Sequence, residues 1–180
     1  MEYLKLNNGV KIPNIGIGVF TLSPNEAEES VYNALQCGYR LIDTANAYEN
    51  EKAVGRGMKK SKIAREEIFL STKLWPSVYE DESAIDKTLE RLDVDYIDLL
   101  FLHQPTENYM FGYRQLEKAY KNRQIKAIGV SNFEGKYIQE ILANCEIKPQ
   151  VIQVEAHPYF TQAQLRKIID IEDIKLMSWY

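Results

Sequence analysis

The chain has 180 residues, of which 45% are hydrophobic and 27% are charged, a balance typical of a globular protein with one sizeable core. Its formal charge of -4 and its pI of about 5.4 argue against nucleic acid or an anionic membrane surface as a partner. No apolar stretch approaches the roughly 18 residues of a membrane span, and the first ten residues lack the pattern of a secretory signal. The two cysteines lie far apart in the sequence, so we predict no disulfide or metal framework and a cytoplasmic location.

The first segment predicts a β-hairpin followed by a helix. Tyr3–Pro13 alternates in polarity around Asn8-Gly9, a pair that tolerates the positive φ angles of a two-residue hairpin turn. Ser23–Glu26 has the pattern of a helix start, with a serine that can cap, a proline in the first turn and a glutamate that can complete a capping box.

From residue 15 onward, strand-like and helix-like segments alternate. Each expected strand is a nearly continuous apolar run, and the seven runs are Ile15–Phe20, Leu41–Asp43, Ile68–Lys73, Tyr96–His103, Ala127–Val130, Val151–Val154 and Ile174–Trp179. Helical patterns lie between them, first after Ser23 and then near residues 49–60, 80–91, 112–121, 134–143 and 161–170. This alternation predicts a parallel sheet covered by helices, and the absence of a linker predicts one domain over residues 1–180.

Two α/β architectures fit the alternation, a Rossmann-type sheet and a (β/α) barrel. The Rossmann fingerprint G-x-G-x-x-G needs a third glycine, but Gly16-Ile17-Gly18 continues as Val19-Phe20-Thr21. A (β/α) barrel with an N-terminal β-hairpin therefore fits the sequence better.

Polar residues close three of the strands at a constant spacing. Asp43, Lys73 and His103 each end an apolar run, and consecutive members of the set are 30 residues apart. In a parallel barrel this spacing places all three at the carboxyl-terminal rim, where barrel enzymes keep their chemistry. Taken singly, each has an ordinary explanation: a capping aspartate, a solvated lysine and a hydrogen-bonded core histidine. Together at one rim they are costly unless paired, which favours a functional site.

Tyr48 follows Asp43 by one short loop, so its phenol can reach the same rim. The set supports proton donation to a carbonyl oxygen. A free phenol has a pKa of about 10, and a neighbouring Lys73 ammonium is expected to lower that pKa. Asp43 would hold the ammonium, and His103 would orient the carbonyl by a hydrogen bond. Because protein side chains supply no hydride, this chemistry requires a hydride-carrying cofactor.

Three longer motifs make the sequence resemble the aldo-keto reductase family. They are Gly38–Glu51 (GYRLIDTANAYENE), Leu102–Pro105 (LHQP) and Ile128–Phe133 (IGVSNF), and the similarity runs from about Leu4 to the last residue. The resemblance implies a (β/α)8 TIM barrel that binds NADPH across the rim, with NADH as the alternative, and reduces aldehydes or ketones to alcohols.

The resemblance also assigns roles to individual residues. Tyr48 resembles the general acid, tuned by Asp43 and Lys73, with His103 orienting the substrate. The positions matched to nicotinamide binding are Ser131, Asn132, Gln153 and Trp179, the last stacking on the ring. The positions matched to the substrate pocket are Phe20, Trp75 and Gln104, and the glutamine stands where many members carry tryptophan, which predicts a more polar pocket. Core filling is the alternative for the two aromatics, and no metal ligand is assigned.

The predicted barrel is incomplete. In the family the strand at Ile174–Trp179 is followed by an eighth unit and a C-terminal tail, and a barrel of this class takes about 250 residues. We therefore expect seven barrel strands, unpaired apolar edges at Ile15–Phe20 and Ile174–Trp179, and low stability or association of this chain in isolation. The complete parent is expected to be a monomer or a weak dimer.

Three hypotheses for function follow. The leading one is a partial chain of an active NAD(P)H-dependent carbonyl reductase. The second is a non-catalytic, cofactor-binding regulatory subunit, against which the intact polar set at the rim argues. The third is an inactive, truncated remnant of such a reductase.

Overall fold

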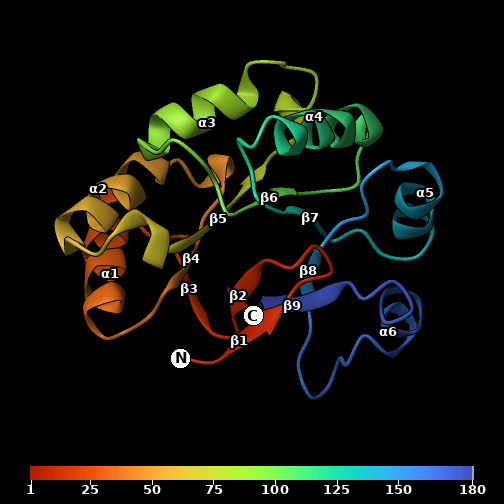
Figure 1. Ribbon diagram of the computed structural model, residues 1–180, viewed down its shortest axis with the longest axis horizontal. Helices are drawn as coiled ribbons and strands as arrows, with labels where there is room; N and C mark the ends of the chain where they lie inside the picture. Colours follow the sequence, from red (N-terminus) through yellow and green to blue (C-terminus); the bar gives the residue numbers. More distant parts are fainter. Residues whose placement is uncertain (180) are drawn as a thin grey trace.

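The computed structural model describes residues 1–179 as a curled parallel sheet with helices on its outer face (Figure 1). The seven strands pair in the order in which they occur in the chain: β3 (Gly16–Gly18), β4 (Leu41–Asp43), β5 (Phe69–Leu74), β6 (Leu99–Leu102), β7 (Ile128–Ser131), β8 (Val151–Glu155) and β9 (Lys175–Trp179). Every pairing in this sheet is parallel. The prediction of seven strands of a (β/α) barrel is confirmed.

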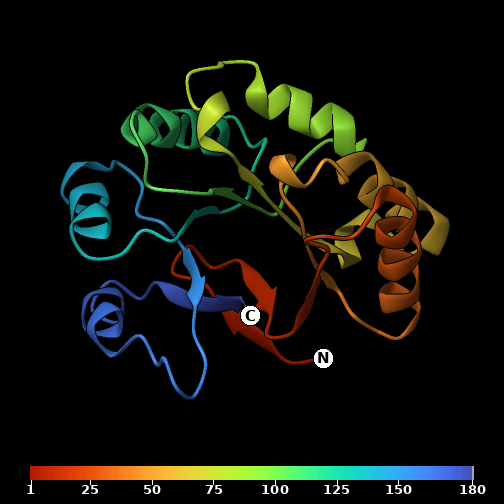
Figure 2. The same cartoon turned by 180° about the vertical axis from the view of Figure 1, so that it is seen from behind.

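Within residues 1–179, six α-helices connect the strands, and they cover the outside of the sheet in both views (Figures 1 and 2). They are α1 (Pro24–Gln36), α2 (Glu51–Ser61), α3 (Ala84–Leu92), α4 (Tyr109–Lys121), α5 (Lys136–Asn144) and α6 (Ala163–Ile169). Three short 3-10 helices are η1 (Asn46–Tyr48), η2 (Arg65–Glu67) and η3 (Pro76–Val78). The predicted capping box of the first helix is present, because the Ser23 side chain accepts from the Glu26 N–H and the Glu26 carboxylate accepts from the Ser23 N–H.

The strand predicted at Tyr96–His103 forms a shorter ladder than expected. Only Leu99–Leu102 form the strand, and Leu100–Leu102 pair on both sides; Ile97 makes an isolated bridge to Ile125. The cause lies in the side chain between them, because the Asp98 carboxylate accepts a hydrogen bond from the Leu70 N–H at 3.0 Å. The Asp98 side chain thus accepts from a backbone N–H that would otherwise be available for a hydrogen bond between the strands.

The N-terminal hairpin pairs β1 (Tyr3–Lys5) with β2 (Lys11–Pro13), as predicted, but its turn differs from the prediction. The Gly9 N–H donates to the Leu6 carbonyl at 2.9 Å and the Leu6 N–H donates to the Val10 carbonyl at 2.8 Å, which leaves a three-residue turn. In this turn only the glycine has a positive φ, of 90°. The expected two-residue turn at Asn8-Gly9 is therefore wrong, because such a turn requires a positive φ at its first residue and here only Gly9 has one.

The hairpin covers the interior of the sheet at the end where the strands begin. Its buried Leu6 and Ile12 belong to one apolar cluster with the first residues of several strands, among them Leu41, Leu99 and Val151. A second and larger apolar cluster lies between the sheet and the helices. The amino-terminal end of the sheet is thus filled by apolar side chains, and polar side chains are concentrated at the opposite rim.

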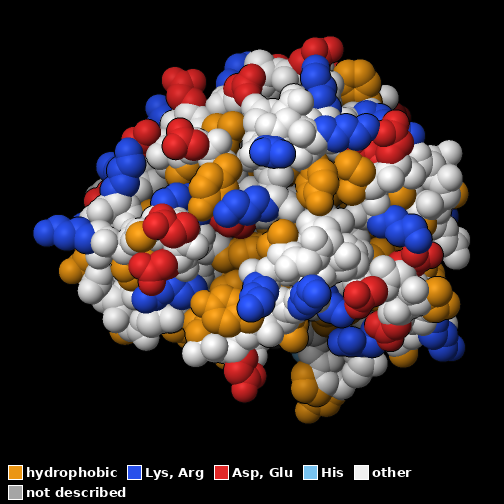
Figure 3. Space-filling model, viewed as in Figure 1, with side chains coloured by type: hydrophobic (Ala, Val, Ile, Leu, Met, Phe, Trp, Pro, Cys, Tyr) orange, Lys and Arg blue, Asp and Glu red, His pale blue; other side chains and the backbone are white. Residues whose placement is uncertain are grey.

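The sheet does not close into a ring within residues 1–179. There β3 pairs only with β4, and β9 pairs only with β8, so each keeps one unpaired edge, as expected. Over the face shown in Figure 3, acidic and basic side chains are interspersed, with apolar side chains exposed between them. None of the helices in the described part of the chain is long and apolar enough to cross a membrane.

Candidate active site

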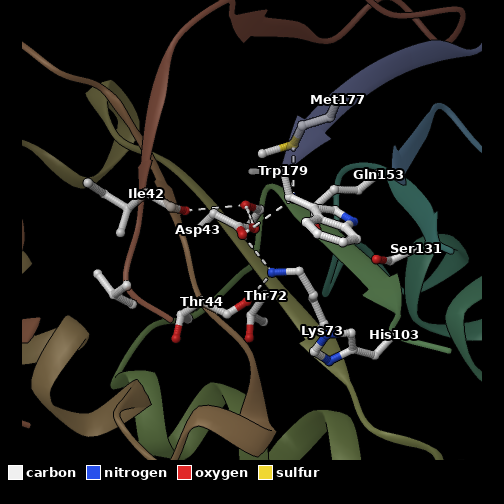
Figure 4. Close-up of polar contacts among 12 residues, drawn as sticks. Ile42, Asp43, Thr44, Thr72, Lys73, His103, Ser131, Gln153, Met177 and Trp179 are labelled. Atoms are coloured by element: carbon white, nitrogen blue, oxygen red, sulfur yellow. Dashed lines mark hydrogen bonds and ion pairs between the residues drawn. The ribbon is translucent and has the colours of Figure 1, made fainter. Parts of the chain in front are cut away.

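An ion pair between neighbouring strands lies at the centre of the carboxyl-terminal rim (Figure 4). Lys73 on β5 is only 1% exposed, and its ammonium donates to the Asp43 carboxylate at 2.6 Å and to the Thr44 carbonyl at 2.8 Å. The other carboxylate oxygen of Asp43 accepts from the Ser71 hydroxyl at 2.6 Å. The ammonium and the carboxylate therefore neutralise each other inside the sheet.

Tyr48 reaches this rim from η1, in the loop between β4 and α2. The centroid of its ring lies 5.2 Å from the Lys73 ammonium and 4.8 Å from the centroid of the Phe20 ring. Burial raises the pKa of Tyr48 above its ordinary value, and the nearby charge of Asp43 raises it further. The expected lowering of the Tyr48 pKa by Lys73 is thus wrong for this structure, because Asp43 compensates the ammonium and burial then dominates.

His103 follows β6 directly and lies beside the tyrosine. Its ring centroid lies 5.8 Å from that of Tyr48 and 4.9 Å from that of Trp75, edge to face in both cases. Burial lowers the pKa of His103 to about 4, and the charge of Lys73 contributes to the lowering. The imidazole is therefore neutral at pH 7. Its buried Nδ1 makes no hydrogen bond within residues 1–179.

The four residues matched to nicotinamide binding are brought together by β7, β8 and β9, with Gln153 of β8 paired in register with Ser131 of β7. Asn132, with a left-handed φ of 66°, donates to the Ser131 hydroxyl oxygen at 3.2 Å and accepts from the Trp179 indole N–H at 3.2 Å. The Gln153 amide donates to the Asp43 carboxylate at 3.3 Å. Figure 4 shows Ser131, Gln153 and Trp179 on the side of the ion pair away from Thr44.

A cavity of about 1160 Å³ opens between these groups and extends down to the hairpin. Ten of the eleven predicted site residues line it: Phe20, Asp43, Tyr48, Trp75, His103, Gln104, Ser131, Asn132, Gln153 and Trp179. The eleventh, Lys73, does not line the cavity, but its ammonium donates a hydrogen bond to the lining residue Asp43. The lining includes residues of both edge strands, β3 and β9, so the cavity takes in the gap between them.

The substrate-side residues differ in how they are held. Phe20 is 66% exposed and Trp75 is 40% exposed, so these aromatics face the cavity mouth and do not fill the core. The backbone of Gln104 is fixed by a buried tyrosine, because the Tyr79 hydroxyl donates to the Gln104 carbonyl at 2.8 Å and accepts from its N–H at 3.0 Å.

Sequence reasoning missed Ser71 and Tyr79 as supports of the site. The serine could have been found from the alternation of β5, since residues 71 and 73 point to the same side of a strand and the second of them is Lys73. The tyrosine gave no such signal, because its partner lies 25 residues away in the sequence, beyond α3 and β6.

The donor set fits a nicotinamide. Its carboxamide needs both donors and acceptors, which the Ser131 hydroxyl and the Asn132 and Gln153 amides provide, and Trp179 lines the same cavity with an aromatic surface. In the described part of the chain, no group of three or more histidine, cysteine or carboxylate side chains is placed to hold a metal ion.

Comparison with known proteins decides the family. Residues 14–180 match the sequence model of the aldo/keto reductase family. The chain belongs to the aldo/keto reductase family. It is 48% identical to a glyoxal reductase of Bacillus subtilis, an alignment that covers 99% of this chain and 66% of that protein.

Solved structures agree with this assignment. An aldo/keto reductase from Brucella melitensis has a TM-score of 0.95 at 40% identity, covering 99% of this chain and 72% of that one. The aldo-keto reductase of Bombyx mori, solved in complex with NADP, has a TM-score of 0.93 at 30% identity, covering 99% of this chain and 66% of that one. This aldo/keto reductase chain spans about two thirds of the length of the curated relatives that it matches.

Proposed function

We propose that the protein reduces aldehydes or ketones to alcohols with NADPH as the hydride donor. One observation carries the proposal: Asp43, Tyr48 and His103 line one cavity of an aldo/keto reductase barrel, and Lys73 forms an ion pair with Asp43 beside it. The glyoxal reductase relative and the NADP complex of the Bombyx mori relative support this reaction class and this cofactor.

The residues proposed to hold the cofactor are on β7, β8 and β9 and directly after β7. Ser131, Asn132 and Gln153 would bind the carboxamide, and the exposed indole of Trp179 would stack on the ring. When bound, NADPH supplies the hydride that the side chains of this chain lack.

Tyr48 is the proposed proton donor to the carbonyl oxygen. Its raised pKa keeps the phenol protonated at neutral pH, so a proton is available for transfer. Transfer leaves a phenolate, which the ammonium of Lys73 stabilises because it lies 5.2 Å from the ring centroid. Asp43 fixes the ammonium in that position through its 2.6 Å ion pair.

His103 is proposed to orient the carbonyl. A neutral imidazole carries a hydrogen on one ring nitrogen, and a pKa of about 4 keeps the ring neutral at working pH. Its hydrogen bond to the carbonyl oxygen would place that oxygen next to the Tyr48 hydroxyl, where negative charge develops during reduction.

The test measures NADPH oxidation by the full-length protein with glyoxal, methylglyoxal and an aromatic aldehyde, and repeats each assay with NADH. We expect Tyr48→Phe to lower kcat by about 100-fold or more, the usual contribution of a general acid. NADPH binding, followed by quenching of tryptophan fluorescence, should persist in this variant. Retained turnover would contradict the role of Tyr48, and NADPH binding by a wild-type protein without turnover would favour the regulatory-subunit hypothesis.

A further inference from the structure

Asn50 stands at the start of α2, where an asparagine usually caps the helix, yet its side chain makes no capping hydrogen bond. The residue is 1% exposed and the side chain turns inward. Its amide nitrogen donates to the Val19 carbonyl at 2.9 Å and to the Leu22 carbonyl at 3.3 Å, and its amide oxygen accepts from the Thr44 hydroxyl at 2.8 Å. The buried Asn50 amide therefore makes three hydrogen bonds to residues outside α2.

These bonds join two loops that both carry residues of the cavity. Residues 44–50 form the loop that presents Tyr48, and residues 19–22 form the loop that presents Phe20. The Asn50 amide donates to carbonyls on both sides of Phe20 in the second loop, those of Val19 and Leu22. The rings of Tyr48 and Phe20 meet at 4.8 Å between their centroids, so Asn50 fixes both partners of this contact.

The same bonds reach the ion pair. Thr44 is fully buried, and its hydroxyl donates to Asn50 while its carbonyl accepts from the Lys73 ammonium at 2.8 Å. Asn50 thereby fixes the loop at the point where Lys73 holds it. The separation of Tyr48 and Lys73 depends on the segment between Thr44 and Asn50.

Tyr48 needs such support because its hydroxyl makes no hydrogen bond to any residue that the structure describes. The hydrogen bond of its backbone N–H is local, to the Ala45 carbonyl at 3.0 Å. The position of the phenol is therefore set by the loop and by ring contacts, and the loop includes a left-handed residue, Glu49, with a φ of 56°.

We propose that Asn50 is a positioning residue for the reduction, acting through the loop that carries Tyr48 and touching neither substrate nor cofactor. This inference rests on the proposed function of Tyr48 as proton donor. Displacement of a reacting group by about 1 Å costs on the order of 100-fold in rate. Asn50→Ala should therefore lower kcat by about 10- to 100-fold while the KM for NADPH changes by less than about threefold.

Gln150 provides a matched control for the loss of a buried amide. It is 3% exposed, its amide oxygen accepts from the Ile128 N–H at 2.7 Å and its amide nitrogen donates to the Lys148 carbonyl at 2.6 Å. It lies just before β8, at the opposite end of the strands from Tyr48. Gln150→Ala should reduce stability to urea as Asn50→Ala does, with kcat within about threefold of wild type.

The experiment measures kcat, KM and urea stability of wild type, Asn50→Ala and Gln150→Ala in the full-length protein, together with hydrogen exchange of cofactor-free protein followed by mass spectrometry. We expect faster exchange over residues 44–50 and 19–22 in Asn50→Ala alone, accompanied by the loss of kcat. Equal kcat in the two variants, or unchanged exchange over both loops, overturns the proposal. A wild-type protein that reduces no carbonyl refutes the proposed function, and the exchange data then still decide whether Asn50 holds the loop.

Discussion

The ammonium of Lys73 and the carboxylate of Asp43 lie 2.6 Å apart between adjacent parallel strands, with side-chain exposures of 2% and 12%. Neither group can be removed from this environment without consequence for the other. A buried charge that loses its partner costs about 3–5 kcal/mol of stability, whereas replacing both charges by neutral groups of similar shape is often close to neutral.

Lys73→Met is therefore expected to lower the free energy of unfolding by about 3–5 kcal/mol, because Asp43 is left as a buried, unpaired carboxylate. The double variant Lys73→Met with Asp43→Asn should recover most of that loss. Urea denaturation of the single and double variants measures both values. Neither variant should reduce carbonyls at more than about 1% of the wild-type rate, since the ammonium beside Tyr48 is gone in both. A double variant as unstable as the single one would show that the unpaired charge of Asp43 does not cause the loss of stability.

Stability should fall on mild acidification because of His103. The unfolded chain binds a proton at this imidazole below about pH 6.5, whereas the folded chain binds it only below about pH 4, so unfolding takes up a proton between these values. The free energy of unfolding then decreases as the pH falls through this window, by about 1–2 kcal/mol from pH 7 to pH 5. Urea denaturation at the two pH values measures the change. The His103→Asn variant should lose this component, and an unchanged pH dependence in that variant would refute the assignment.

Gly55→Ala is expected to destabilise the protein although alanine favours helices. A Cβ at Gly55 would lie 2.2 Å from the Leu92 carbonyl oxygen, which belongs to backbone and cannot rotate away, so α2 and α3 would have to separate. We expect the free energy of unfolding to fall by about 1–3 kcal/mol, whereas the same substitution at an open helix site would raise it by about 1 kcal/mol through helix propensity. Thermal and urea unfolding measure the change. Gly18→Ala is the control, since a Cβ there meets nothing within 4 Å, and its stability should stay within about 0.5 kcal/mol of wild type.

The 180-residue chain by itself is expected to associate with rising concentration. Within the described residues, β3 and β9 each leave one edge unpaired, and exposed strand edges pair with other chains. Light scattering after size exclusion at about 5 and 100 μM should show a mass that increases with concentration. A monomer at both concentrations with one cooperative melting transition would contradict this expectation.

Much of the site could be predicted from strand order. The strand–helix units of this chain have about the same length, and the strands are parallel. Asp43, Lys73 and His103, which occupy equivalent positions in successive units, therefore lie at one rim. The hydrogen-bond partners could not be predicted in the same way. Whether Asn50 caps its own helix or holds a loop 28 to 31 residues earlier depends on the direction of one side chain, and both uses satisfy the same amide.

The sequence alone determined the alternation of strands and helices, the family motifs and the identity of the four polar residues at the rim, because these follow from local pattern and from order along the chain. The tertiary structure decided the electrostatics. The Tyr48 pKa is raised and not lowered, because Asp43 compensates Lys73 and the phenol is partly buried, and both conditions depend on distances between residues on different strands and loops. Charge type can be read from a sequence, but the balance between burial and pairing appears only when the chain is folded.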